Sequence, residues 1–353
     1  MESSTSPIIE QSRHAQVEFS GKAGEFFGIW IVNILLSILT LGIYSAWAKV
    51  RTNQYFYGHT RIEDQPFRYL AKPLQILKGR LIAVALFASY FILSAVAPIA
   101  GLLMALGLMF LMPFLIVLSM RFSMRMTSYR NVRFDFHGSY ADAFINFLLL
   151  PILSIFTLYL LMPWVLKRID QYLHSNISYG GKRLQVNNDA GTYYAAVLII
   201  MAVVTGVIMT AVILGFVIAF LFPFSFGAEW AMVLVFGIIL LYWLILMLSG
   251  AIYKCMIRNH LFSRTVLPDT ASFASKMQVM PYLWLTVSNL LAILCTFGLA
   301  YPWARVRKTA YLANATSLTL QPGIDQLVDT VQQQTAAFGE EAAGLFDVDI
   351  SLA

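Results

Sequence analysis

The sequence predicts an all-α polytopic membrane protein built from internal repeats, each a membrane segment followed by a basic cytoplasmic motif. Of its 353 residues, 59% are hydrophobic and 12% are charged, which is about half the charged share of a soluble domain. Apolar segments long enough to cross a bilayer alternate with loops that hold the lysines and arginines. A short tryptophan–basic motif recurs where apolar segments end. These three observations define the predicted class.

The recurring motif is a tryptophan followed by basic residues, with a tyrosine four residues beyond the last arginine. Its three copies are Trp47-Ala48-Lys49-Val50-Arg51 with Tyr55, Trp164-Val165-Leu166-Lys167-Arg168 with Tyr172, and Trp303-Ala304-Arg305-Val306-Arg307 with Tyr311. Two degenerate copies are Arg121-Phe122-Ser123-Met124-Arg125 with Tyr129, and Lys254-Cys255-Met256-Ile257-Arg258 with Phe262. Alternating residues typical of short extended chain accompany the copies at Thr60-Arg61-Ile62, Val132-Arg133-Phe134-Asp135-Phe136 and Ser317-Leu318-Thr319-Leu320. Each repeat is therefore predicted as a membrane segment, a basic helix end and a short extended piece.

The apolar segments follow the order single, hairpin, single, hairpin, single. The single segments are 26–47, 141–166 and 281–303, and the hairpins are 81–120 and 193–252, with turns expected at Pro98 to Gly101 and Pro223 to Glu229. A forty-residue run is long enough for two spans and a turn. The predicted organisation is an N-terminal cytoplasmic tail at 1–25, a repeat-built transmembrane domain at 26–320 and an acidic C-terminal cytoplasmic tail at 321–353.

The charge distribution predicts which side each loop faces. None of the 24 lysines and arginines lies in the two hairpin turns, so the positive-inside rule places both turns outside and the motif loops and termini in the cytoplasm. The single segments have basic loops on both flanks, which a simple span would separate. Two arrangements are open: four full spans plus three re-entrant or broken segments, or seven simple spans.

The motif residues form a candidate site for an anionic headgroup, because clustered basic helix ends bind lipid phosphates. The candidates are Trp47, Lys49, Arg51, Trp164, Lys167, Arg168, Trp303, Arg305 and Arg307. The alternative is that they are interfacial anchors without a ligand. Mid-segment Asn33, Asn146 and Asn289 are candidates either for helix–helix hydrogen bonds or for a solute pathway through broken helices.

Other classes of function find little support. The interiors of the apolar segments contain no Asp, Glu, Lys, Arg or His, which disfavours a proton-coupled pump. The five histidines and two cysteines lack metal-ligand spacing, and no nucleophile elbow, P-loop or dinucleotide fingerprint occurs. We therefore expect no enzyme activity, no metal and no cofactor. The net charge of +6 is explained by the cytoplasmic loops rather than by nucleic acid.

Several stretches together resemble the YjgN-type family of bacterial inner-membrane proteins, a domain of unknown function. They are Phe19-Ser20-Gly21, Thr40-Leu41-Gly42-Ile43-Tyr44, the first copy of the motif, Tyr55-Phe56-Tyr57-Gly58 and Leu345-Phe346-Asp347. The resemblance implies a multi-pass protein of the bacterial cytoplasmic membrane and brings no catalytic or binding residues. The second copy has Leu166 where the other two have a cation, which weakens an exact threefold site.

Two functions remain as hypotheses. The first is a non-enzymatic membrane protein that binds anionic lipid or a lipid-like ligand at its cytoplasmic side. The second is a transporter or channel for a small or amphipathic solute that works through the broken helices. Membrane lipids are the expected partners in both, and the oligomeric state is left open. The acidic stretch 339–350 is a candidate for docking on the basic loops.

Overall fold

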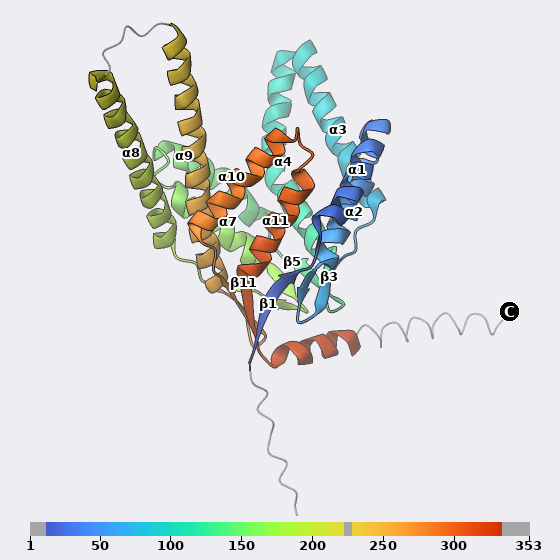
Figure 1. Ribbon diagram of the computed structural model, residues 1–353. Helices are drawn as coiled ribbons and strands as arrows, with labels where there is room; N and C mark the ends of the chain where they lie inside the picture. The colour runs from blue at the N-terminus through green and yellow to red at the C-terminus, as the bar shows by residue number, and fades with distance from the viewer. Residues whose placement is uncertain (1–11, 222–227, 334–353) are drawn as a thin grey trace, which may run out of the picture.

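The computed structural model describes residues 12–221 and 228–333. In chain order its elements are β1 (Arg13–Phe19), α1 (Ala23–Leu39), α2 (Ser45–Gly58), β2 (Thr60–Ile62), β3 (Gln65–Tyr69), α3 (Pro73–Val96), α4 (Pro98–Arg125), β4 (Thr127–Tyr129), β5 (Val132–Phe136), α5 (Tyr140–Phe144), η1 (Ile145–Leu149), α6 (Leu150–Phe156), α7 (Met162–Ser175), β6 (Ile177–Tyr179), β7 (Lys182–Arg183), β8 (Gln185–Val186), α8 (Ala190–Leu221), α9 (Ala228–Ser263), β9 (Thr265–Leu267), β10 (Ala271–Ser275), α10 (Val279–Cys295), α11 (Tyr301–Asn314) and β11 (Thr316–Leu320). A further helix covers 323–333. Figure 1 shows the long helices rising from one side of the strands and the helix 323–333 beneath them.

The all-α prediction is wrong, because eleven short strands form one antiparallel sheet. Their order is β7-β6-β5-β4-β3-β2-β1-β11-β10-β9-β8. The two edge strands, β7 and β8, are consecutive in the chain and are separated only by Leu184. The sheet therefore curls into a nearly closed ring, which leaves little exposed edge. The alternating stretches at 60–62, 132–136 and 317–320 fall within β2, β5 and β11.

The prediction of seven apolar segments is also corrected. Within the described residues, four helices are long and apolar enough to cross a membrane, α3, α4, α8 and α9, whereas the apolar helices at 23–39, 140–156 and 279–295 are shorter. Each shorter helix belongs to a unit of strand, helix, break, helix and strand. The two strands of a unit pair antiparallel: β1 with β2, β5 with β6, and β10 with β11. A unit whose two ends are neighbours in one sheet returns to the side where it began, so seven simple spans are excluded.

The break in each unit has the same local construction. A threonine ends the first helix in each unit: Thr40, Thr157 and Thr296. Its hydroxyl donates to a carbonyl of that helix and accepts from the backbone N–H four residues later, at 2.9, 3.2 and 2.9 Å. The next two residues have positive φ, and in the first and third units the second of them is Gly42 or Gly298. The left-handed conformation with its backbone bonds is a common way to end a helix.

The long helices form two antiparallel pairs, α3 with α4 and α8 with α9 (Figure 1). Helix α3 ends at Val96 and α4 begins at Pro98, so the chain turns at Ala97. This is one residue before the turn predicted at Pro98 to Gly101. The second predicted turn, Pro223 to Glu229, lies largely outside the described residues. Large apolar side chains along the pairs are exposed, for example Phe91 at 66%. Apolar surface of this extent is suited to lipid rather than water.

The inside of the strand ring is a hydrophobic core that helix 323–333 completes. Inward-facing strand residues such as Ile62, Tyr129 and Leu318 are buried together with Ile324 and Val328 of that helix. The helix therefore covers the end of the ring opposite the long helices (Figure 1). The division into a membrane domain and two tails stays a prediction. Residues 13–19 and 323–333 of the expected tails pack in the sheet and against it, and the stretch 339–350 lies outside the described residues.

Candidate functional site

The strand ring encloses a cavity of about 590 Å³, a size in the range of small-ligand sites. Its wall is made of side chains at alternate strand positions, because successive residues of a strand point to opposite faces. The strand residues that line it are Thr60, Ile62, Phe67, Thr127, Tyr129, Phe134, Ile177, Tyr179, Leu267, Ala271, Phe273, Leu318 and Leu320, joined by Leu184 between β7 and β8. Nearly all of them are apolar or aromatic, so the wall favours an apolar occupant.

The two ends of this cavity, which we call the ring cavity, differ in chemistry. Ile324 of the helix 323–333 lines one end. At the other end the lining comes from the helices that lead into the strands, and it includes Asn53 and Phe56 of α2 and Arg305 and Thr309 of α11. Polar and charged groups are therefore gathered at the helical end, while the opposite end is apolar.

Arg305 is the charged group at that end. Its guanidinium carbon lies 4.5 Å from the ring centroid of Phe56 and 5.7 Å from that of Phe26, so aromatic faces hold it in place. Within the described residues it forms no ion pair with a carboxylate. A guanidinium fixed by its face keeps its edge N–H groups for a bidentate anion.

A second cavity, of about 600 Å³, lies beside the first between α1, α2 and α11. Arg305 lines this one too, with Lys49, Arg80 and Asn33 among its other residues. Arg80 donates to the Ser45 hydroxyl. Asn33 is 4% exposed, and its Oδ1 has no hydrogen-bond partner. This cavity therefore offers three cations and one buried, unsatisfied acceptor.

The predicted motif residues lie in different surroundings: some line a cavity, and others are exposed or bonded to neighbouring side chains. Lys49 and Arg305 line one cavity, whereas Arg51 is exposed and its Nη1 lies 3.4 Å from the Tyr44 hydroxyl. Trp47 stacks on Tyr44, with ring centroids 6.1 Å apart. Arg307 donates to Ser288 Oγ at 2.7 Å and covers the Trp303 ring at 5.0 Å.

The second copy of the motif lies apart from these cavities. Arg168 is exposed and covers the ring of Trp164 at 5.8 Å, and Lys167 Nζ donates to Gln171 at 2.9 Å. None of the three lines the ring cavity or the cavity beside it. The basic groups that meet at one place come from the first and third copies.

The three mid-segment asparagines do not make equivalent contacts. Asn33 and Asn289 donate across the break to the carbonyls of Ala48 and Ala304, at 3.4 and 3.2 Å, and so tie the two helices of their units. Asn146 instead donates to Asp142 O in its own helix at 2.7 Å, in the stretch where the helix widens to a π-turn. Helix–helix hydrogen bonding therefore accounts for two of the three.

Several lining residues were missed from the sequence. Asn53 and Arg80 carry no motif of their own, and both line the cavity beside the ring. The sequence did carry a signal of the ring wall, because apolar and polar residues alternate around Ile62, Phe134 and Leu318, each on a different strand. The signal could have been found by asking which face of each short strand is apolar.

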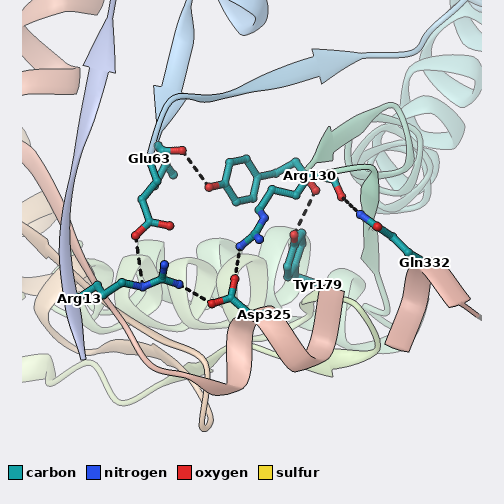
Figure 2. A network of polar contacts seen from close by, with 8 residues as sticks. Arg13, Glu63, Arg130, Tyr179, Asp325 and Gln332 are labelled. Carbon is teal, nitrogen blue, oxygen red and sulfur yellow. Dashed lines mark hydrogen bonds and ion pairs between the residues drawn. The ribbon is translucent and has the colours of Figure 1, made fainter. Parts of the chain in front are cut away.

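A polar network fixes the helix 323–333 under the ring (Figure 2). Asp325 accepts from Arg130 Nη1 at 2.6 Å and also pairs with Arg13, whose Nε lies 3.5 Å from Glu63 Oε1. Gln332 donates to the Arg130 carbonyl at 3.1 Å. Burial, the largest single influence, would lower the pKa of Arg130, but the hydrogen bond and the charge attraction of the Asp325 carboxylate together leave the pKa above the ordinary value.

Two ring tyrosines complete this network (Figure 2). Tyr179 Oη donates to the Tyr129 carbonyl at 3.0 Å, and Tyr129 Oη donates to the Ile62 carbonyl at 3.0 Å. Burial raises the pKa of the Tyr129 hydroxyl to about 12 and also raises the pKa of Tyr179. Both hydroxyls therefore stay protonated and act as donors that link every second strand, β6 to β4 and β4 to β2.

Within 12–221 and 228–333, no three His, Cys, Asp or Glu side chains gather closely enough to hold a metal ion. Four long apolar helices standing on a sheet that encloses a cavity define an integral membrane protein. The chain belongs to the family described as bacterial protein of unknown function (DUF898), whose model matches residues 14–345.

Its relatives place it in the bacterial inner membrane. The inner membrane protein YjgN of Salmonella typhimurium strain LT2 is 25% identical over an alignment 353 positions long, gaps included. The alignment covers 88% of this chain and 89% of the relative. The proteins of the same name from Escherichia coli O157:H7 and Escherichia coli strain K12 are 34% and 33% identical over 136 and 141 residues, 38% of this chain and 34% of each relative. No solved structure matches the chain.

Proposed function

We propose that this protein binds an anionic amphipathic ligand, such as a lipid, with its apolar part in the ring cavity and its charged group at Arg305. The role is one of binding rather than of enzymatic catalysis. The observation that supports it most directly is Arg305, a cation without a carboxylate partner among the described residues, at the entrance of an apolar cavity. An apolar pocket with one convergent charge suits a ligand that has both characters.

The setting of the cavity agrees with this proposal. We propose that the three strand–helix–helix–strand units are an internal repeat of a multi-pass protein and that the sheet faces the cytoplasm. The hairpin turns hold no lysine or arginine, and cytoplasmic loops collect these residues. The helical end of the ring cavity would then lie near the cytoplasmic leaflet, where anionic lipids are plentiful.

The test uses the full chain in nanodiscs of phosphatidylcholine, with a fluorescent fatty acid as the probe and its binding constant as the readout. Arg305→Gln should weaken binding by about tenfold, through loss of a charge-assisted hydrogen bond. Ala271→Phe should weaken it too, because Ala271 lines the ring cavity and is 4% exposed. Arg61→Gln is the matched control, since Arg61 is an exposed cation beside the lining residue Ile62 on β2.

Two outcomes would reject this site. Unchanged affinity in both Arg305→Gln and Ala271→Phe would remove the ring cavity as the binding place. Affinity lost only when Arg51, Arg168 and Arg307 become Gln together would move the ligand to the exposed basic motif residues. In each case the variants' melting temperatures show whether the fold has been kept.

A second candidate function is transport of a small or amphipathic solute. The observation that favours it is that Arg305 lines three cavities: the ring cavity, the one beside it, and a third of about 520 Å³ against α9 and α10. Three cavities that share one lining residue support a route rather than a closed pocket. Flux of the same fatty acid across reconstituted vesicles, reduced by changes at Asn33 or Asn289, would favour transport, and binding without flux would favour the first function.

A further inference from the structure

We infer that the protein has a separate binding site for a phosphate-type anion, in a cavity of about 500 Å³ between α7, α9 and α11. Four basic side chains line it: His174, Lys254, Arg258 and Lys308. Arg258 lines none of the three cavities that Arg305 lines, although Lys254 and Lys308 also line the third of them. The inference therefore goes beyond the proposed lipid site at Arg305.

The observation that carries the inference is the state of Arg258. Its Nε is buried and has no hydrogen-bond partner. Its Nη2 donates to the Thr316 hydroxyl at 3.0 Å, and its guanidinium lies 4.2 Å from the ring centroid of Phe262. Within the described residues it forms no ion pair with a carboxylate.

Arg258 is half-buried, and a charge that loses hydration without gaining a counter-ion is unfavourable. Thr316 and Phe262 hold the guanidinium in place but supply no negative charge. An anion bound in the cavity would satisfy the free Nε–H and neutralise the charge. The planar guanidinium is well matched to phosphate oxygens.

The fold itself does not require an arginine at this position. Thr127 and Thr265 begin equivalent strands, and each hydroxyl donates to the carbonyl four residues earlier, at 2.9 and 2.7 Å. Seven residues before them stand Met120 on α4 and Arg258 on α9, so the strand starts match Arg258 to Met120 and not to Arg125, its counterpart in the degenerate copies of the motif. Met120 packs against a hydrophobic cluster, so a methionine is compatible with the same structural position.

The other charges around the cavity leave an excess of positive charge. Asp170 also lines it, but its Oδ2 accepts from the Tyr193 hydroxyl at 2.7 Å. His174 Nδ1 lies 2.8 Å from the Asp170 carbonyl oxygen. Lys254, Arg258 and Lys308 against Asp170 give three positive charges and one negative, a net charge of +2 with His174 neutral. That excess matches the one or two negative charges of a phosphate group.

The same chemistry could come from two sources, a phospholipid headgroup or free phosphate. The test therefore uses two kinds of nanodisc with the full chain. In phosphatidylcholine nanodiscs, inorganic phosphate is titrated, and the melting temperature and heat of binding are measured. In the second set, phosphatidylglycerol replaces part of the phosphatidylcholine, and no phosphate is added. A response in the first set indicates free phosphate, and a response in the second alone indicates a lipid headgroup.

Arg258→Met introduces the residue that α4 has at the equivalent place. We expect it to weaken the response to phosphate or phosphatidylglycerol by at least about tenfold, through loss of the charge-assisted hydrogen bonds. Without anion it should melt at the same temperature as the wild type or higher, because an unpaired, half-buried charge is gone. Lys308→Gln, at an exposed lining residue, should weaken the response by a smaller factor. Arg264→Gln, an exposed cation that does not line the cavity, should change nothing.

Two results would overturn the inference: a wild-type protein that responds to neither anion, or Arg258→Met responding as the wild type does. If Arg258→Met loses stability in general, Lys308→Gln decides instead. A Lys308→Gln variant that responds to the anions as the wild type does would then overturn the inference. The outcome is separable from that of the proposed lipid function. Arg305→Gln should leave the phosphate response unchanged, and Arg258→Met should leave fatty-acid binding in the ring cavity unchanged.

Discussion

The contact of the helix 323–333 with the ring can be tested through one carboxylate, Asp325. Its two oxygens pair with two different cations, Arg130 and Arg13, which come from the β4–β5 turn and from β1 (Figure 2). Asp325→Asn keeps the size of the side chain and removes its charge. We expect the helix to leave the ring more often, because both ion pairs are lost together.

The size of the effect follows from exposure and geometry. The Asp325 and Arg130 side chains are 32% and 24% exposed, and their contact is 2.6 Å, so a charge-assisted hydrogen bond of about 1.5 to 3 kcal/mol applies. Arg13 is 50% exposed, and its pair with Asp325 adds less than about 1 kcal/mol. The amide can still make a neutral hydrogen bond, so the net loss should be about 2 kcal/mol. That value corresponds to a change of about 30-fold in the opening equilibrium.

Cysteine accessibility measures this opening directly. Val328 is 2% exposed under the ring, so Val328→Cys should react slowly with a maleimide, in a background where the exposed Cys295 is replaced by Ser. Adding Asp325→Asn should raise the labelling rate by about 30-fold. Asp329→Asn, at an exposed residue of the same helix, is the matched control and should leave the rate unchanged. Equal rates in the two variants would show that the ion pairs do not hold the helix.

Two further predictions concern the helix units and the ring. Asn289→Leu should lower the free energy of unfolding by about 1 to 3 kcal/mol, because it removes the hydrogen bond to the Ala304 carbonyl and the acceptor of Arg307 Nη1. Asn146→Leu breaks only a bond within one helix and should cost less. Equal melting-temperature losses in detergent would contradict this. Burial raises the pKa of Tyr129 from 10 to about 12. The contribution of its protonated hydroxyl to the free energy of unfolding, on the order of 2 kcal/mol, is therefore complete below pH 10 and is lost as the pH rises toward 12. Thermal unfolding at pH 9 and 11 should show a smaller pH dependence in Tyr129→Phe, and an unaltered slope would refute the assignment.

The membrane helices and the short strands differ in how well the sequence reveals them. Residues 81–120 are apolar over a length that only a pair of membrane helices explains, and the structure has α3 and α4 there. Strands such as β2 and β4 have three residues each, too few for a period of two to be distinguished from chance. The extended pieces were visible in the sequence, but their assembly into one sheet was not.

Long-range pairing explains why the ring itself could not be predicted. Arg13 of β1 lies opposite Leu320 of β11, and no local pattern links residues so far apart in the sequence. The nearly closed ring also depends on Leu184, a single residue between the two edge strands. Register and closure are properties of the whole sheet, whereas hydrophobic patterns describe one segment at a time.

In the candidate site, too, the sequence pattern reveals the basic residues, whereas their roles depend on packing. The motif identified Arg305 together with Arg51 and Arg307, because all three follow a tryptophan in the sequence. Only packing distinguishes them: Arg307 is bonded to Ser288, Arg51 is exposed, and Arg305 is held on Phe56 at the entrance of the ring cavity. A repeated motif predicts equivalent roles, and the different neighbours of each copy remove that equivalence.

Arg305 and Arg258 are two of the arginines that have no carboxylate partner among the described residues, and both line cavities. Arg125 pairs with Asp135, and Arg130 and Arg13 share Asp325. These pairs join strands, turns and the helix 323–333 around the sheet. Arg305 and Arg258 lie instead where helices meet, and each is held on a phenylalanine ring with no carboxylate among its described contacts. If these arginines were only structural, an ion pair like those of the sheet arginines would give a lower free energy than an unpaired charge. Their places at cavities, without a carboxylate among the described residues, therefore support an anionic ligand as the counter-ion.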